Sequence, residues 1–171
     1  MSIIIFSGPV HSGKTTELQQ WLEQIPITKT VAGILMPDIN GSRKIFNIKT
    51  KEIADIECSD PENATGPLTT VGRYHFYTAA FEKANTIIAE DAKVASDILI
   101  IDEVGLLELD HKGFYEATKR SVEIQEYKNG NKILLLVVRD SLYGQVISFF
   151  NIKSHTLVHR LDKIPLSVAN N

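Results

Sequence analysis

Residues 8–15 read GPVHSGKT and match the pattern G-x-x-x-x-G-K-[S/T], the Walker A motif or P-loop, at every fixed position. A short apolar, β-branched run at 3–7 precedes the motif, and apolar residues recur after it at helical spacing over 14–25. The sequence therefore predicts a strand, a glycine-rich loop and a helix in direct succession. The loop's backbone N–H groups and the positive end of the helix would then face the same phosphate oxygens. The stretch predicts a site for a nucleoside triphosphate.

The fixed residues of this loop have expected roles. Gly8 and Gly13 let the backbone turn tightly and bring its N–H groups onto the phosphates. The Lys14 ammonium is expected to reach the β- and γ-phosphates, and the Thr15 hydroxyl is expected to bind Mg²⁺. Thr16 is expected either to touch the α-phosphate or only to open the helix, and loop filler is favoured over a catalytic role for His11. The predicted nucleotide-contacting residues are Gly8, Pro9, Val10, His11, Ser12, Gly13, Lys14, Thr15 and Thr16.

A second motif, ILIID at 98–102, predicts a buried strand that ends in a metal-binding carboxylate. Asp102 is expected to bind Mg²⁺ through a coordinated water. Glu103 follows at once, and a carboxylate there polarises a water for in-line attack on the γ-phosphate, as general base or positioning group. Adjacent Asp-Glu is typical of the additional-strand ATPases. The weaker switch-GTPase pattern D-x-x-G also fits 102–105, but no N-K-x-D guanine-reading motif occurs, so hydrolysis through Glu103 is favoured.

Three arginines are further candidates. Arg139 follows an apolar strand predicted at 132–138. It is expected either to stabilise transition-state charge at the γ-phosphate or to pair with Asp140 or a surface acid. Arg43 and Arg73 are weaker candidates for phosphate or base contacts, and surface charge is favoured for both.

Strands that alternate with helices predict the fold class, an α/β three-layer sandwich with a mostly parallel sheet. Asn40-Gly41 predicts a hairpin, and thus an antiparallel insertion. The stretch 59–70 is expected to be a disordered loop or a mobile lid, and Asn129-Gly130 is expected to close a helix. Residues 1–171 are predicted to form one domain. Strands are expected over 3–7, 31–36, 43–48, 52–57, 73–77, 98–102, 132–138 and 155–160, and helices over 14–25, 78–95, 111–128 and 140–150.

Composition narrows the class of protein. The net charge of −3 gives no basic surplus of the kind that nucleic-acid binding as the main task would need. The one cysteine, Cys58, cannot form an internal disulfide and fits a reducing compartment. No apolar run approaches the roughly 18 to 20 residues that span a membrane, and the N-terminus lacks the features of a signal peptide. A cytoplasmic protein is expected, with a monomer favoured.

These motifs together resemble a family of small P-loop nucleoside-triphosphatases known from thermophiles and from a human cancer-related form. The stretches that carry the resemblance are GPVHSGKTT (8–16), GILMPDINGSRKIFNI (33–48), VGRYHFYTAAFEKA (71–84) and ILIIDEVGLLEL (98–109). The resemblance implies a RecA-like P-loop fold and slow Mg²⁺-dependent hydrolysis of ATP, GTP and other nucleoside triphosphates. It also matches Glu108 to a family glutamate with a supporting role, in water positioning or the second shell of the metal; the alternative is a helix-entry carboxylate. The sequence departs from the family's pattern at 38–40 and 110–112, and these departures bear on which nucleotide base the enzyme prefers and on its rate of hydrolysis.

Two other functions stay open. A nucleotide kinase would use the same P-loop for its donor, with an acceptor in place of the attacking water and the loop at 59–72 closing over it. The five arginines lie far apart in the sequence, which weighs against an arginine-rich kinase lid. A nucleotide-binding switch with incidental turnover ranks third. The favoured enzyme is a phosphohydrolase with Lys14, Glu103, Glu108 and Arg139 as catalytic residues and Thr15 and Asp102 as metal ligands.

Overall fold

The computed structural model of the chain describes residues 2–94, 96–127 and 132–164. Their strands are β1 (Ser2–Gly8), β2 (Val31–Leu35), β3 (Asp38–Ile39), β4 (Ser42–Asn47), β5 (Ile53–Asp55), β6 (Leu68–Val71), β7 (Tyr74–Tyr77), β8 (Ile98–Val104), β9 (Ile133–Arg139) and β10 (Thr156–Val158). Their α-helices are α1 (Lys14–Gln24), α2 (Thr78–Lys93), α3 (Leu106–Leu109), α4 (Tyr115–Tyr127) and α5 (Tyr143–Phe149). Short 3₁₀ turns are η1 (Pro61–Asn63), η2 (Asp140–Leu142) and η3 (Leu161–Lys163).

The main sheet has the strand order β10-β1-β9-β8-β2-β4-β3, with β5 paired to β4. The pairs from β10 to β2 are parallel, whereas β4 runs antiparallel to β2, β3 and β5. The strand β9 lies between β1, which leads into the P-loop, and β8, which carries the acidic pair. A mostly parallel sheet with a small antiparallel extension is therefore confirmed.

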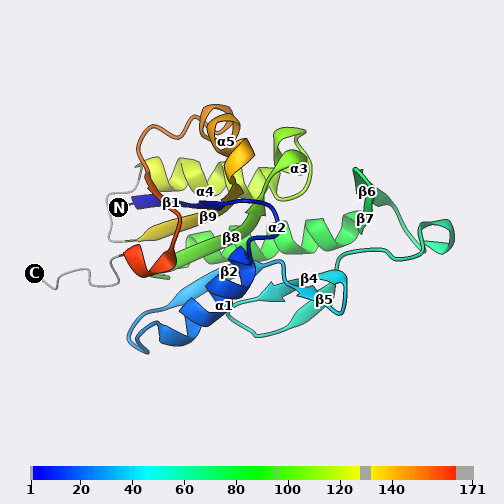
Figure 1. Ribbon diagram of the computed structural model, residues 1–171, viewed down its shortest axis with the longest axis horizontal. Coiled ribbons are helices and arrows are strands. Elements are labelled where there is room, and N and C mark those ends of the chain that lie inside the picture. The colour runs from blue at the N-terminus through cyan, green and yellow to red at the C-terminus, as the bar shows by residue number, and fades with distance from the viewer. Residues whose placement is uncertain (1, 95, 128–131, 165–171) are drawn as a thin grey trace, which may run out of the picture.

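Helices cover both faces of the sheet, as Figure 1 shows with α1 on one side and α4 and α5 on the other. Successive residues of a strand point to opposite faces, and the strands here are apolar on both. Ile5 of β1 belongs to a buried cluster with Ile88 of α2 and Val146 of α5. Its neighbour Phe6 belongs to a second cluster with Leu18 of α1. The predicted layer arrangement, helix on sheet on helix, follows from this alternation.

An irregularity near the end of β8 decides how the acidic pair is presented. Ile101 pairs with Leu136 and Val104 pairs with Val138, so two residues of β8, Asp102 and Glu103, lie opposite one residue of β9. Such a bulge turns neighbouring side chains out of strict alternation. The strand thus continues two residues past Asp102, where the sequence predicted its end.

The insertion contains the predicted hairpin and a second one. Asn40 and Gly41 have φ angles of 56° and 78°, as a type I′ turn between β3 and β4 requires. The expectation of a loop throughout 59–70 is wrong at its end, because Leu68–Val71 forms β6 and pairs with β7 around a turn at Gly72. Thr69, Thr70 and Val71 are β-branched, which favours a strand, and Figure 1 shows this hairpin beside the start of α2.

The helix expected over 111–128 begins only at Tyr115, as α4, because Gly113 has a φ of 61° and interrupts the helical path. A separate short helix, α3 at 106–109, precedes it and was not predicted. The predicted stop at Asn129-Gly130 lies outside the described residues. The helix expected to run to about residue 95 ends at Lys93, and the stretch 140–150 begins with η2 before α5. None of the helices in the described ranges is long and apolar enough to cross a membrane.

Candidate active site

The P-loop connects β1 to α1, as the motif predicts. Gly13 precedes the helix with a φ of 82°, and no side chain caps the helix N-terminus at that position. The first N–H groups of a helix lack partners within it and carry partial positive charge. An anion held by the loop would therefore meet backbone donors at the start of α1.

Lys14 lies inside the loop with only 8% of its surface exposed. Its ammonium donates hydrogen bonds to the carbonyl oxygens of Gly8, at 3.1 Å, and Pro9, at 2.8 Å. A cation is thus held where the loop curls, by backbone carbonyl oxygens. The other loop side chains predicted to contact nucleotide are exposed at Pro9, Val10, His11, Ser12 and Thr16.

Thr15 and Asp102 come together although 87 residues separate them. The Thr15 hydroxyl donates to Oδ2 of Asp102 at 2.9 Å, and the backbone N–H of Met36 donates to the same oxygen at 3.1 Å. Asp102 is only 2% exposed. Burial, and then the neighbouring charge of Glu103, raise the pKa of Asp102 to about 6 against the hydrogen bonds from Met36 and Thr15.

This pair of residues fits a magnesium ion. A hydroxyl and a carboxylate are the hard oxygen donors that Mg²⁺ prefers, and Mg²⁺ usually takes one or two protein ligands and completes its shell with water and phosphate. No group of three or more His, Cys, Asp or Glu side chains arranged for a metal occurs among residues 2–94, 96–127 and 132–164. One hydroxyl and one carboxylate would leave most of the coordination shell of Mg²⁺ to water and phosphate oxygens.

Glu103 forms an ion pair with Arg139, in which the Arg139 Nε donates to Oε1 of Glu103. Its side chain is 16% exposed and that of Arg139 is 34% exposed, so the pair is partly shielded from solvent. The ion pair that the sequence allowed for Arg139 was one with Asp140 or a surface acid, and the partner is instead Glu103. Asp140 instead accepts a hydrogen bond from the backbone N–H of Ser141 at 2.7 Å.

Glu108 lies at the entry to α3 and is 2% exposed. Its Oε2 accepts the backbone N–H of Gly105 at 2.6 Å, and its Oε1 accepts that of Phe114 at 2.8 Å. Burial outweighs these two donors and raises the pKa of Glu108 to about 7. The contacts are those of the helix-entry role that the sequence left open. They also join α3 to the start of α4.

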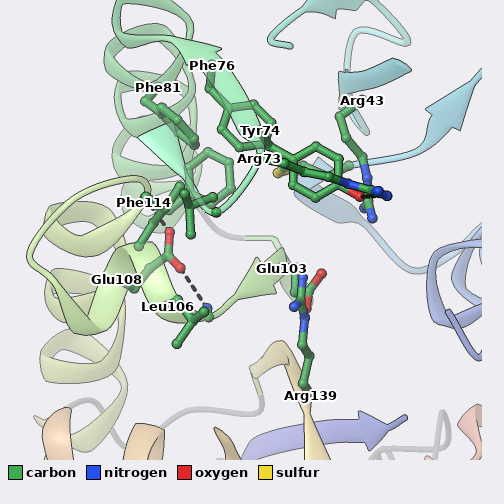
Figure 2. Close-up of a pocket in the computed structure, with 15 residues that line it drawn as sticks. Arg43, Arg73, Tyr74, Phe76, Phe81, Glu103, Leu106, Glu108, Phe114 and Arg139 are labelled. Atoms are coloured by element: carbon green, nitrogen blue, oxygen red, sulfur yellow. Dashed lines mark hydrogen bonds and ion pairs between the residues drawn. The ribbon is translucent and has the colours of Figure 1, made fainter. Parts of the chain in front are cut away.

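A cavity of about 240 Å³ opens beside Glu103. Figure 2 shows Arg43, Arg73, Glu103 and Arg139 along one side of it, with Phe76, Phe81 and Phe114 along the other. No residue of the P-loop lines this cavity, so it adjoins the phosphate site without being part of it. Sequence reasoning missed the aromatic residues, although Tyr74 and Phe76 alternate along a predicted strand and so share one face.

Comparison with known proteins places these features in a family. The family model described as NTPase matches residues 3–163. Over 125 residues the chain is 34% identical to the nucleoside-triphosphatase THEP1 of Methanopyrus kandleri, covering 70% of this chain and 67% of that protein.

Two solved structures share the fold. The crystal structure of THEP1 from the hyperthermophile Aquifex aeolicus matches with a TM-score of 0.66 and 21% identity, over 95% of this chain and 91% of that one. The solution structure of a human cancer-related nucleoside triphosphatase matches with a TM-score of 0.64 and 18% identity, over 95% and 90% of the two chains. At these sequence identities the two structures support the fold assignment alone.

Proposed function

We propose, from the premise that this chain belongs to the NTPase family and is a nucleoside-triphosphatase, that Glu103 directs water onto the γ-phosphate of a Mg²⁺-bound nucleoside triphosphate. The products are the nucleoside diphosphate and inorganic phosphate. The observation that carries this assignment is the position of Glu103, one residue past the buried Asp102 and paired with Arg139.

The P-loop binds and orients the triphosphate. When phosphate enters, the Lys14 ammonium exchanges the carbonyl oxygens of Gly8 and Pro9 for β- and γ-phosphate oxygens. The backbone N–H groups at the start of α1 face the same oxygens. Thr15 and Asp102 would hold Mg²⁺, directly and through a water. The bound ion supplies positive charge that offsets the negative charge on the phosphate oxygens.

Glu103 and Arg139 act on the reacting atoms. The γ-phosphate competes with Glu103 for the Arg139 guanidinium, because both are anions near one cation. Once Arg139 turns to the phosphate, the Glu103 carboxylate is left to accept a proton from water. The water oxygen bonds to the γ-phosphorus as the bond to the bridging oxygen breaks. Arg139 then stabilises the charge that develops during transfer.

The strand order supports membership of the additional-strand group of P-loop enzymes. The strand β9 separates the P-loop strand β1 from β8, which carries Asp102 and Glu103. Arg139 stands at the end of this intervening strand. This position, between the P-loop strand and Glu103, supports the proposal that Arg139 responds to the γ-phosphate.

One product analysis tests hydrolysis against the kinase alternative. Purified protein is incubated with Mg²⁺ and ATP, with and without a panel of nucleoside monophosphates, and free phosphate and diphosphates are followed by chromatography. The account expects phosphate release in the absence of any acceptor and its loss when EDTA removes Mg²⁺. Diphosphate formation that requires an acceptor, with little free phosphate, would make Glu103 the base for an acceptor hydroxyl.

A further inference from the structure

The cavity beside Glu103 brings together segments that are remote in sequence. Its walls come from Met36 after β2, from β4, the β6–β7 hairpin, the first turn of α2, the end of β8, α3, Phe114 before α4 and the end of β9. Aromatic and aliphatic side chains form its inner side, where Phe76 meets Phe81 edge to face at a centroid distance of 5.7 Å and Phe81 meets Phe114 at 5.1 Å. The cavity is therefore a built apolar pocket with preformed aromatic walls.

The rim of the same cavity is cationic. Arg43 is half-buried, and no ion pair or side-chain hydrogen bond of its guanidinium occurs within the part of the chain that the structure describes. The Arg73 guanidinium lies 5.1 Å from the centre of the Tyr74 ring and donates to the Tyr74 hydroxyl at 3.0 Å. Arg139 is paired with Glu103. Two of the three arginines thus have no carboxylate partner at the rim.

The acids nearby offset this charge only in part. Asp102 interacts electrostatically with Arg43, and Glu57 with Arg73, but neither forms an ion pair with its arginine. Glu57 accepts the backbone N–H of Arg43 at 2.8 Å through Oε2, so one of its oxygens is already used. The two oxygens of Glu108 are both taken by backbone N–H groups. An arginine that faces an aromatic pocket and has no ion-pair partner favours an anion that carries an apolar ring.

We propose that this cavity binds a second small ligand, one that joins an aromatic ring to an anionic group, next to the γ-phosphate of the nucleotide. The ring packs against Tyr74 and Phe76, and the anion meets Arg43 and Arg73. A volume of about 240 Å³ lies just below the 300–1,000 Å³ of ordinary small-molecule sites and so suits a single-ring compound. The ligand lies outside the P-loop and shares only its border, Glu103 and Arg139, with the hydrolytic site.

Phenyl phosphate is a probe with both features. Its binding is measured by calorimetry with Mg²⁺ and a non-hydrolysable ATP analogue at saturating concentration, so that the P-loop is already filled. Phenol supplies the ring alone and inorganic phosphate the anion alone. The proposal expects phenyl phosphate to bind about tenfold or more tightly than either control, because ring and anion contribute together. Equal or absent binding of all three compounds at millimolar concentration would overturn it.

Two variants locate the binding. Arg43→Gln should weaken phenyl phosphate binding by about tenfold or more, the loss expected for a charge-assisted hydrogen bond. Tyr74→Leu should weaken it through lost ring stacking. Arg120→Gln, an exposed arginine of α4 outside the cavity, is the matched control. The same affinity in Arg43→Gln and Arg120→Gln, with both proteins folded by thermal unfolding, would place the probe elsewhere and refute the site.

A separate assay keeps this test distinct from that of the hydrolytic mechanism. Phosphate release by the wild-type enzyme without any probe reports on the hydrolytic site alone. Failure of phenyl phosphate to bind an enzyme that releases phosphate normally would remove the second site and leave the hydrolytic assignment in place.

Discussion

Replacement of the buried Glu108 by glutamine should change how stability depends on pH. In the folded protein the pKa of Glu108 is raised from an ordinary value of 4.5 to about 7, because burial disfavours the carboxylate. Below pH 4.5 the group is protonated in both the folded and unfolded states. Between these two values the folded state keeps a proton that the unfolded state has lost. The free energy of unfolding therefore falls as pH rises through this window and levels above about pH 7.

The size of this effect follows from the two pKa values. The interval from 4.5 to about 7, at about 1.4 kcal/mol for each pH unit, corresponds to about 3 kcal/mol in all. Most of it, about 2 to 3 kcal/mol, falls between pH 5 and pH 8. Glutamine has no proton to lose in this range, so Glu108→Gln lacks this contribution.

Urea unfolding of wild-type and Glu108→Gln protein at pH 5, 6, 7 and 8 measures the difference. The stability of the variant relative to wild type should rise by about 2 to 3 kcal/mol from pH 5 to pH 8. The amide nitrogen of glutamine must face one backbone N–H, of Gly105 or Phe114, which adds an offset that does not vary with pH. Glu82→Gln, at an exposed position of α2, is the matched control. Parallel curves for wild type and Glu108→Gln would refute the reasoning.

Three other substitutions test the loop, the arginine and the sheet. Lys14→Ala should lower ATP affinity and turnover together, because the ammonium contacts phosphate throughout the reaction; titration of a fluorescent ATP analogue and phosphate release would detect any separation of the two. Arg139→Gln should lower kcat by about 100-fold or more, since its charge acts on transfer; a wild-type kcat contradicts that role. Gly33→Ala should lower the free energy of unfolding by about 3 kcal/mol or more. At Gly33 φ is 101° and a Cβ would lie 2.0 Å from the Ile100 carbonyl oxygen, whereas Gly66→Ala meets nothing within 4 Å, so equal urea midpoints for these two variants would contradict the packing argument.

The phosphate half of the site could be predicted because its signals are local. A glycine-rich loop between an apolar strand and an amphipathic helix needs only consecutive residues to be recognised. The acidic pair after a second buried strand then places a carboxylate beside the loop, since parallel strands end at the same edge of the sheet. The 2.9 Å contact between Thr15 and Asp102 agrees with this inference.

The strand β6 was missed because its neighbours have loop composition. Gly66 and Pro67 adjoin β6, and they masked the β-branched run that follows. The strand gains its hydrogen bonds only by pairing with β7, a contact that residue propensity does not encode.

The side-chain partners of the second half of the site depend on distances that no pattern specifies. Arg139 pairs with Glu103, 36 residues away, because β8 and β9 are neighbours and a bulge turns Glu103 toward it. Glu108 reaches Phe114 because Gly113 lacks a Cβ, which would lie 2.2 Å from the Glu108 Oε1. The cavity draws on several segments that are remote in the sequence, so Arg43 and Arg73 at its rim were judged as surface charges.

The role of Glu103 as the water-activating group is tested most directly by Glu103→Gln. Phosphate release under single-turnover conditions, together with the Kd for a Mg²⁺-bound ATP analogue, should be compared in wild type and variant. Glu116→Gln, an exposed glutamate of α4, is the control. The account predicts a rate lower by about 100-fold or more, because proton transfer from water is removed. The Kd should not rise, because the P-loop contacts remain and Arg139 is released from its ion pair. Phosphate release at the wild-type rate by the folded variant would contradict it.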